Sequence, residues 1–361
     1  MDIPLKGFMR NICVSTAGQS FFARSMVEPL ESSVKQIPKI TQKSTKRSTV
    51  HTFQFGIDLG GTKTELIVLS AAGQTCFRRR VPTPASDYKA ILHTIVSLVH
   101  QAEAELGISA QALGIGAPGT AFGPEGRLKN ANTTCLIGQP LASDMYALLN
   151  IPVIVENDAN CLVLSEATDG AGAGSHVVFG VILGTGVGGG LVINGQLING
   201  PNRITGEWGH NPLPRWFDQA HGTPTPRPCY CGSQDCIETY LSGKGLSLTH
   251  QQLGLAEHPR ISAQEIVALA ISGDPIAVTA IDLYFDTLAQ SLSTIVNVID
   301  PDVVVFGGGL SQLPGLCDAV QLRLSQHVFG ADMRTKLAIA MHGDSSGVRG
   351  ASWLTQTGAG A

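Results

Sequence analysis

Phe55-Gly-Ile-Asp-Leu-Gly-Gly-Thr-Lys-Thr-Glu65 is the most informative stretch of this chain. A short apolar strand runs into Asp58, the chain turns through Gly60-Gly61-Thr62, and an apolar strand resumes at Leu66. Glycine lets backbone N–H groups approach a phosphate closely, and a carboxylate at the same place suits Mg²⁺, which prefers oxygen ligands. On these residues alone, an ordinary β-hairpin with a Gly-Gly turn is an equally good interpretation.

A second stretch, Phe179-Gly-Val-Ile-Leu-Gly-Thr-Gly-Val-Gly-Gly-Gly190, repeats the frame of the first. Asp58 aligns with Ile182, so only the first copy carries the acid. We interpret the pair as an internal duplication at the scale of a domain. Two similar α/β halves would each offer a glycine-rich hairpin to a shared cleft, where both hairpins hold phosphates and the first also handles a metal ion.

The second copy also satisfies the dinucleotide-binding pattern G-x-G-x-x-G, at Gly184, Gly186 and Gly189. That fingerprint requires a helix to open at the last glycine. Here Leu191-Val-Ile193 predicts a strand, and Asn194-Gly195 is a hairpin-turn signal. The sequence also contains no G-x-x-x-x-G-K-[ST] motif. Both an NAD-binding Rossmann site and a P-loop NTPase are therefore disfavoured.

The composition indicates an ordinary globular protein. At 361 residues the chain is long enough for about two domains, and 43% hydrophobic residues can build sizeable cores. The net charge of −4 gives no general attraction to nucleic acid, and no apolar run is long enough to span a membrane. Of the eight cysteines, three are crowded together and five are scattered. This is unlike a secreted disulfide framework, so we expect a reducing compartment and a cytoplasmic location.

Residues 1–52 differ from the rest of the chain, because Lys and Arg outnumber acids, Ser and Thr are frequent, and no helix or strand pattern persists. We predict a flexible basic extension. It is interpreted either as a transit peptide for import into an organelle or as the result of a start codon placed too early, with Met26 as the later candidate. A basic nucleic-acid-binding arm is the weakest alternative, because the basic run has no interleaved aromatic residues.

Strands alternate with helices in the remainder. The predicted strands cover 53–59, 64–70, 75–81, 113–119, 153–155 and 303–306, and the predicted helices cover 90–106, 159–168 and 275–298. This pattern predicts an α/β fold with mixed sheets. We expect an N-terminal domain over 53–160, completed by a helix at about 345–357, and a C-terminal domain over 161–344. Ligands gather at the carboxyl ends of strands in open α/β sheets, so Asn157 and Asp158 are well placed for chemistry.

A cysteine cluster lies in the segment 207–238, where His210 is followed by Cys229-Tyr-Cys231-Gly-Ser-Gln-Asp-Cys236. Three cysteines and one histidine form a Cys₃His set, which is typical of a closed structural zinc site. Free thiols or a strained disulfide are the alternatives, and a reducing compartment favours zinc. Zinc would hold Glu207 and Glu238 near each other, although each glutamate could equally be a surface carboxylate.

Taken together, these motifs resemble those of the ROK family (repressors, ORFs, kinases), which includes sugar kinases. The resemblance covers about 53–355 and rests on five motifs in the same order. These are Asp58–Lys63, Glu156–Asn160, Gly184–Gly186, Glu207–His210 and the block from Cys229 to Glu238. It implies two similar α/β domains of the actin-like ATPase (ribonuclease H-like) fold around a central cleft. Within the family, 206–214, 228–232 and 342–351 look most like bacterial fructokinases (manno(fructo)kinases).

The resemblance implies ATP-dependent phosphorylation of a hexose, with fructose as the first candidate, and with ATP, Mg²⁺ and a structural Zn²⁺ in a homodimer. Asp158 would be the catalytic base that accepts the proton of the attacking hydroxyl, and His210 would bind zinc with one ring nitrogen and face the sugar with the other. The implied sugar-binding residues are Asn132, Asn157, Asp158, Glu207, His210 and Glu238. The implied ATP-binding residues are Asp58, Gly60, Gly61, Thr62, Lys63, Gly184, Thr185, Gly186, Gly308 and Gly309. The implied metal ligands are His210, Cys229, Cys231 and Cys236 for zinc and Asp58 for magnesium.

The sequence departs from the family pattern in two places, and these leave alternatives open. The stretch from His210 to Cys229 is long and proline-rich, which leaves the fourth zinc ligand open, and the extension over 1–52 has no counterpart in the kinases. A kinase for mannose, glucose or an N-acetylhexosamine is one alternative function. The other is a sugar-responsive transcriptional regulator without turnover, which the intact Asp58, Lys63 and Asp158 disfavour. We expect neither a nucleic-acid nor a membrane partner.

Overall fold

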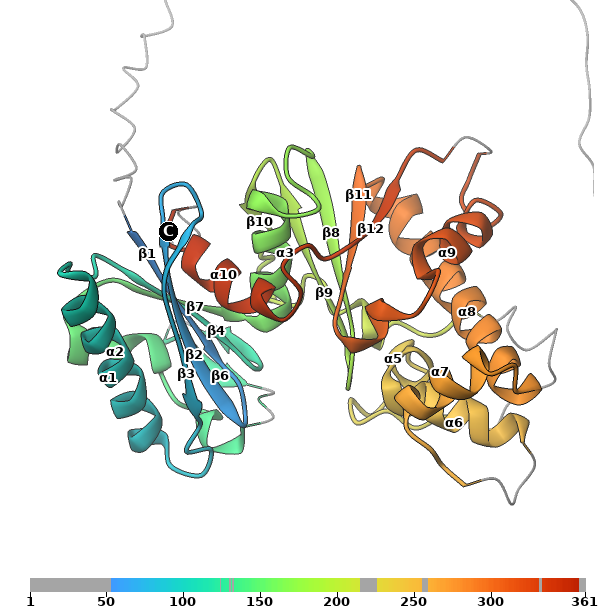
Figure 1. Ribbon diagram of the computed structural model, residues 1–361, viewed down its shortest axis with the longest axis horizontal. Helices are drawn as coiled ribbons and strands as arrows, with labels where there is room; N and C mark the ends of the chain where they lie inside the picture. Colours follow the sequence, from blue (N-terminus) through green and yellow to red (C-terminus); the bar gives the residue numbers. More distant parts are fainter. Residues whose placement is uncertain are drawn as a thin grey trace, which may run out of the picture. The chain divides into compact units, whose positions relative to one another are not determined.

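The computed structural model describes residues 53–356, with gaps at 124, 130, 132, 215–225, 255–258 and 331–332. The extension predicted over 1–52 and the predicted sugar ligand Asn132 lie outside the described residues. Figure 1 shows the arrangement of the described helices and strands.

The first sheet has five strands in the order β3-β2-β1-β4-β7. Its strands are β1 (Phe53–Leu59), β2 (Lys63–Ser70), β3 (Thr75–Pro82), β4 (Leu113–Ala117) and β7 (Val153–Asn157). The first three are antiparallel neighbours, and β4 and β7 continue the sheet parallel to β1. The small hairpin of β5 (Thr120–Phe122) and β6 (Arg127–Lys129) and the 3-10 turn η1 (Thr134–Leu136) follow β4.

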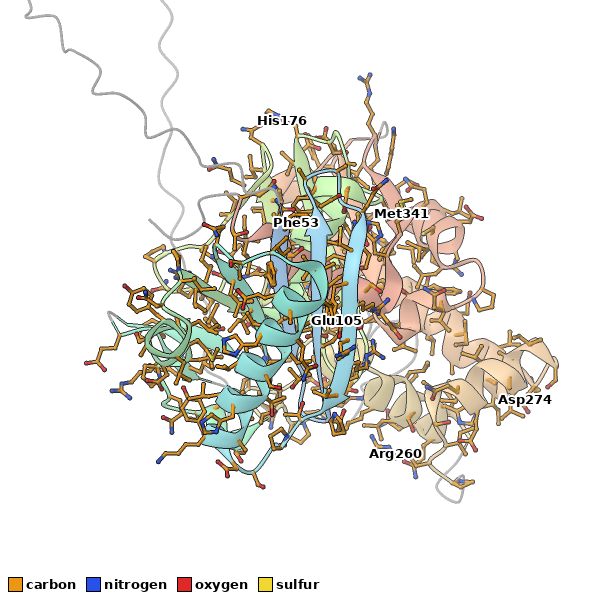
Figure 2. All side chains as sticks on the ribbon, turned by 60° about the vertical axis from the view of Figure 1, so that its left-hand side comes forward. Phe53, Glu105, His176, Arg260, Asp274 and Met341 are labelled. Carbon is orange, nitrogen blue, oxygen red and sulfur yellow. The ribbon has the colours of Figure 1, made fainter. Side chains whose placement is uncertain are left out.

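Helices α1 (Tyr88–Leu106) and α2 (Leu141–Leu149) accompany this sheet. Helix α1 begins two residues before the predicted Ala90, because the Asp87 side chain caps it by accepting a hydrogen bond from the Ala90 N–H at 3.1 Å. It ends at Gly107, whose φ of 66° is left-handed and favours glycine. In Figure 2, α1 lies across the first sheet, in agreement with its contacts with β2 and β3.

The second sheet repeats the first, with the strand order β10-β9-β8-β11-β12. Its strands are β8 (Val177–Leu183), β9 (Val187–Ile193), β10 (Gln196–Leu197), β11 (Val303–Gly307) and β12 (Lys336–Ile339). As in the first sheet, the opening hairpin is antiparallel and the next strand is parallel to the first. The shared order agrees with the predicted duplication, and β9 is the strand that disfavoured a Rossmann site.

The remaining elements belong to the second half or connect the two sheets. The helices are α3 (Asp158–Asp169), α5 (Glu238–Leu241), α6 (Gly243–Leu253), α7 (Ala263–Ile271), α8 (Pro275–Ile299), α9 (Leu316–Leu324) and α10 (Ser346–Trp353). The 3-10 turns are η2 (Trp208–His210), η3 (Gly309–Gln312) and η4 (Gly343–Ser345). Within the described ranges, no single helix is both long and apolar enough to cross a membrane, although α7 and α8, which meet at a bend of 113°, together meet that test by length and composition.

Helices α3 and α10 pack side by side (Figure 1). Helix α10 also contacts β1, β2 and β4, whereas α3 contacts β8 and β9, so the pair joins the two sheets. Glycine allows this close packing, because a Cβ at Gly350 would lie 1.6 Å from the Cys161 carbonyl oxygen and a Cβ at Gly114 would lie 1.8 Å from that of Ala351. The N-terminus of α3, with Asp158, is thereby held beside the first sheet.

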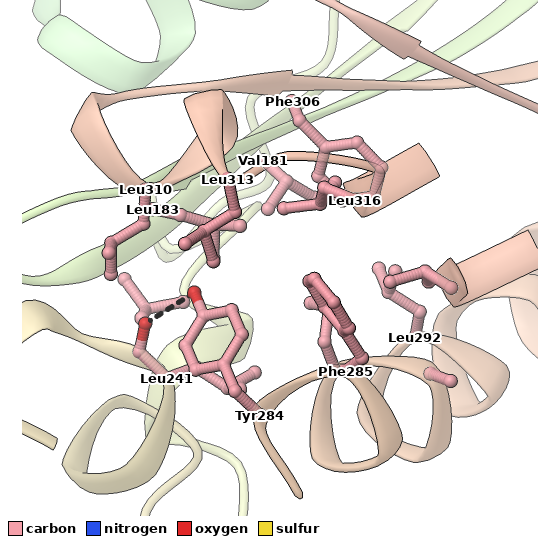
Figure 3. Packing of buried hydrophobic residues seen from close by; sticks show 14 of the residues in the cluster. Val181, Leu183, Leu241, Tyr284, Phe285, Leu292, Phe306, Leu310, Leu313 and Leu316 are labelled. Atoms are coloured by element: carbon pink, nitrogen blue, oxygen red, sulfur yellow. Dashed lines mark hydrogen bonds between the residues drawn. The ribbon is translucent and has the colours of Figure 1, made fainter. Parts of the chain in front are cut away.

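The core of the second half fixes the short helix α5, which begins at Glu238 (Figure 3). Tyr284 and Phe285 of α8 pack with Phe306 of β11 and other buried apolar side chains. The buried Tyr284 hydroxyl donates a hydrogen bond to the Leu241 carbonyl oxygen at 2.9 Å. Because a buried hydroxyl without a partner is costly, this bond ties the end of α5 to α8.

Candidate active site

The first glycine-rich turn is a hairpin that also leaves its backbone accessible. The Gly60 N–H donates to the Lys63 carbonyl oxygen at 2.9 Å, and the Thr83 hydroxyl donates to the Gly60 carbonyl oxygen at 2.8 Å. Gly61, Thr62 and Lys63 are all exposed. The two interpretations of this sequence are therefore compatible, because the hairpin holds an open turn that can face an anion.

Asp58 lies at the end of β1, directly opposite Glu65 of β2. Burial, followed by the charges of Asp158 and Glu65, raises the pKa of Asp58 to about 6. Glu65 is buried itself, and hydrogen bonds from Arg78 and Arg80 outweigh this burial and lower its pKa. A raised pKa means that the ionised carboxylate is poorly stabilised by its surroundings. A cation bound beside the open turn would stabilise it.

Asn157 and Asp158 lie where β7 ends and α3 begins. The Asn157 side chain accepts a hydrogen bond from the Ala159 N–H at 2.8 Å and donates one to the Gly119 carbonyl oxygen at 3.1 Å. Asp158 also accepts from the Ala159 N–H, at 2.8 Å. Its carboxylate is reached by solvent but is closely surrounded by protein atoms, and this desolvation raises its pKa. A raised pKa brings a carboxylate closer to neutral pH, where a general base is most effective.

The acid that precedes this pair, Glu156, is buried and organises the neighbouring loop. It accepts hydrogen bonds from Asn160 at 3.0 Å, from Asn199 at 2.6 Å and from Arg203 at 3.0 Å. The loop over 199–203 is thereby fastened to the end of β7. Sequence reasoning did not single out this network, because Asn199 and Arg203 lie more than 40 residues from Glu156 and no local motif marks them.

Two further acids, Glu207 and Glu238, belong to this region, because the charges of both Asp158 and Glu238 act on Glu207. Partial burial raises the pKa of Glu207, His210 lowers it, and the charges of Asp158 and Glu238 raise it again. The Glu238 side chain accepts a hydrogen bond from the Val187 N–H at 2.9 Å, and a Cβ at Gly186 would lie 2.6 Å from the same oxygen. The second glycine-rich turn therefore meets Glu238 directly, which the sequence alone did not show.

The structure brings the four predicted metal ligands together. Ligand atoms of His210, Cys229, Cys231 and Cys236 all lie within 4.8 Å of one another, and the cysteines are free thiols. The His210 Nδ1 atom lies 3.5 Å from the Cys229 Sγ atom, whereas Nε2 lies 2.9 Å from the Tyr230 hydroxyl and 3.9 Å from a Glu207 carboxylate oxygen. The donor set can hold a metal ion, and the second nitrogen of His210 faces away from the thiols.

A cavity of about 710 Å³ opens at the second glycine-rich turn. Gly184 and Thr185 line it together with Gly309, and all three belong to the ATP-binding residues that the family resemblance implies. Gly308 adopts a φ of 82°, and a Cβ there would lie 2.4 Å from the Leu183 carbonyl oxygen, so this position requires glycine.

Other lining residues of this cavity come from the N-terminal parts of α6 and α7 and from the residues before α7, and they include Lys244, Arg260 and Gln264. Sequence reasoning missed these residues, because exposed polar residues at helix starts are common and carry no special spacing.

Comparisons with known proteins match residues 54–358 to the ROK family. The chain is 42% identical to the N-acetyl-D-glucosamine kinase of Shigella flexneri serotype 5b (strain 8401) and 41% identical to that of Escherichia coli O139:H28 (strain E24377A / ETEC). Each match extends over 304 residues and covers 84% of this chain and 99% of the relative.

Two solved structures share the fold at moderate identity. The ROK hexokinase from Thermus thermophilus is 28% identical with a TM-score of 0.74, and the match covers 84% of this chain and 97% of that one. The ROK family glucokinase from Streptomyces griseus, in complex with glucose and AMPPNP, is 29% identical with a TM-score of 0.67, and the match covers 85% and 100%. The predicted fold of two α/β domains is confirmed, and the chain belongs to the ROK family.

Proposed function

We propose that this chain transfers the terminal phosphoryl group of ATP to N-acetyl-D-glucosamine. At the coarser level, the chain is an ATP-dependent sugar kinase of the ROK family. The observation that carries the choice of sugar is the 42% identity with an N-acetyl-D-glucosamine kinase along 99% of that enzyme. Fructose, which the motifs alone favoured, becomes the second candidate.

Phosphoryl transfer needs positioning, neutralisation of charge and one proton acceptor. In our proposal Asp158 accepts the proton of the attacking sugar hydroxyl, and its raised pKa supports this role. Asp58, with its raised pKa and its place beside the open turn, would hold Mg²⁺. When bound, Mg²⁺ supplies positive charge that offsets the charge of the phosphates.

The two glycine-rich turns would bind the phosphates. Gly60, Gly61, Thr62 and Lys63 would do so from the first turn, and Gly184, Thr185 and Gly186 from the second. The cavity beside the second turn would take the adenosine, with Gly308 and Gly309 against it. In support, the described part of its lining combines apolar side chains such as Val267 and Leu310 with the basic Lys244 and Arg260.

The sugar would be bound by Asn157, Glu207, His210 and Glu238, together with Asp158. Their side chains offer both donors and acceptors, which suits a ligand covered with hydroxyl groups. A site that pairs each hydroxyl rejects analogues that lack one, because its own buried polar groups are then left unpaired. Asn132, the remaining predicted sugar ligand, lies outside the described residues.

We also propose that the Cys₃His cluster holds one structural zinc ion. Three thiols and one imidazole within 4.8 Å of one another form the set of a closed zinc site, which leaves no open position for chemistry. Zinc would fix the orientation of His210 and would hold the loop between Cys229 and Cys236. Both sides of the sugar site, at Glu207 and at Glu238, adjoin this cluster in sequence.

A coupled assay of ADP release with Mg-ATP tests the proposal. The sugars compared are N-acetylglucosamine, N-acetylmannosamine, glucose, mannose and fructose. We expect the highest kcat/KM with N-acetylglucosamine. A higher value with fructose or another hexose would overturn the choice of sugar and retain the kinase. Sugar binding without turnover of any sugar would favour the regulator instead.

A further inference from the structure

Tyr230 lies against the sugar-facing nitrogen of His210, although the proposed function assigns it no role. Its hydroxyl is 2.9 Å from the His210 Nε2 atom. The two rings meet edge to face, with centroids 5.1 Å apart and planes at 88°. The Tyr230 side chain is nevertheless 81% exposed. The hydroxyl of an exposed tyrosine normally forms hydrogen bonds with water. Its contact with a histidine of the site therefore calls for an explanation.

His210 can make only one hydrogen bond on this side. Its Nδ1 atom faces the Cys229 thiol at 3.5 Å, which leaves Nε2 as the other ring nitrogen. Each ring nitrogen of an imidazole makes one in-plane hydrogen bond, either as donor or as acceptor. The Tyr230 hydroxyl and a sugar hydroxyl therefore cannot both bind Nε2. This conflict rests on the proposed function, in which His210 binds the sugar.

The backbone around Tyr230 is held on both sides. Cys229 and Cys231 flank it, and both belong to the Cys₃His cluster. The Cys229 N–H donates to the Ser233 carbonyl oxygen at 2.9 Å, and the Gly232 N–H donates to the Cys229 carbonyl oxygen at 3.1 Å. The exposed side chain can therefore rotate into solvent without a movement of the loop, and such rotations take picoseconds to nanoseconds.

We propose that Tyr230 is a side-chain latch on the sugar site, whose hydroxyl occupies His210 Nε2 in the sugar-free enzyme and is displaced by the sugar. The Tyr230 hydroxyl is a phenol, which carries its proton at neutral pH and can make this hydrogen bond. A sugar that enters must replace the bond to His210 with one of its own hydroxyls. The latch thereby lowers the affinity for every sugar and most strongly penalises a sugar without a hydroxyl at that position.

The variant Tyr230→Phe tests the latch, because it keeps the ring and removes only the hydroxyl. A hydrogen bond contributes about 0.5–1.5 kcal/mol net, so the Kd for N-acetylglucosamine should fall by about two- to tenfold. Calorimetric titration of the sugar into the full chain without nucleotide measures this directly. KM for the sugar should fall in parallel while kcat stays within about twofold. Tyr146→Phe, on α2, is the matched exposed control and should change neither value.

An unchanged Kd in Tyr230→Phe would overturn the latch, and a raised Kd would also do so, because it would mean that the hydroxyl contacts the sugar. Tyr230→Ala should lower the Kd as well, and metal analysis of both variants should match the wild type. A loss of metal together with a fall in kcat would indicate a merely structural role and would overturn the latch. If the wild type prefers another hexose, only the choice of sugar fails, and the same comparison is made with that hexose. Absence of any sugar binding by the wild type would overturn both proposals.

Discussion

Replacing Asp158 by asparagine should abolish most of the catalysis and leave the fold intact. Asparagine has the same shape and keeps a side-chain oxygen that can accept the Ala159 N–H, as Asp158 does at 2.8 Å. The Asn157 side chain accepts the same N–H and caps α3 independently. The substitution therefore removes the proton acceptor and one negative charge, with little change in hydrogen bonding.

The expected magnitudes follow from the position of Asp158. A general base contributes about 10²- to 10⁴-fold to the rate, so kcat should fall by at least about a hundredfold. The loss of a carboxylate from the first turn of α3 should cost about 0.3–1 kcal/mol of stability. In the folded protein the pKa of Asp158 is raised above its ordinary value of 3.8, so the ionised carboxylate destabilises the fold at neutral pH. Its removal offsets the lost helix-dipole interaction, and Tm should stay level or rise.

The assay combines kcat from coupled ADP release, the Kd of the sugar from calorimetry, and Tm from differential scanning calorimetry. Asp318→Asn is the matched control, because Asp318 also lies in the first turn of a helix, α9, and plays no part in the site. A kcat of Asp158→Asn within about tenfold of the wild type would refute the role as base. A fall in Tm of about 4 °C or more would refute the electrostatic argument.

Three further predictions concern the metal acid, the cysteine cluster and the helix contact. Asp58→Asn should stabilise the fold above about pH 6 by up to about 3 kcal/mol, because the folded pKa of about 6 exceeds the ordinary 3.8. In thermal melts this gain should vanish as the pH falls to 3.8, and a gain independent of pH would contradict the prediction. Cys236→Ser should lose zinc and raise the KM for the sugar; elemental analysis of wild-type protein purified without chelator tests the site itself, since absence of zinc would exclude it. Gly350→Ala should lower the free energy of unfolding by about 1–3 kcal/mol, because its Cβ would lie 1.6 Å from the Cys161 carbonyl oxygen. Gly347→Ala on the same helix should leave stability unchanged, because the nearest atom to its Cβ would lie 3.8 Å away. Equal melting temperatures of these two variants would contradict the packing argument.

Elements with a strong local pattern could be predicted from the sequence. Helix α8 runs over Pro275–Ile299 against a prediction of 275–298, because Asp274 caps it and Pro275 occupies its first turn. The repeated glycine hairpins predicted two similar sheets, and the strand orders match. Helix α10 covers Ser346–Trp353 within the predicted 345–357. The predicted domain boundaries, the homodimer and the cytoplasmic location stay predictions.

The site could be predicted only where its residues belong to compact motifs. Except for His210, the ligands of the Cys₃His cluster lie in one short block of the sequence. The structure brings all four ligands together. The ion pair of Glu65 with Arg80 forms only when β2 pairs with β3. The ion pair of Glu156 with Arg203 forms only when the loop over 199–203 returns to the end of β7. No spacing in the sequence marks such pairs, because their partners meet only after the sheet has formed. The motifs do not determine the choice of sugar for a related reason, since shared motifs position a hexose without showing which groups surround it.

Mass spectrometry of the sugar product shows whether this chain phosphorylates N-acetylglucosamine. The full chain is incubated with Mg-ATP and N-acetylglucosamine, and both the sugar phosphate and ADP are quantified. We expect one phosphorylated N-acetylglucosamine for each ADP formed, and at least about a hundredfold less of both products in the same time with Asp158→Asn. ADP release without a phosphorylated sugar, or sugar binding without either product, would contradict this expectation.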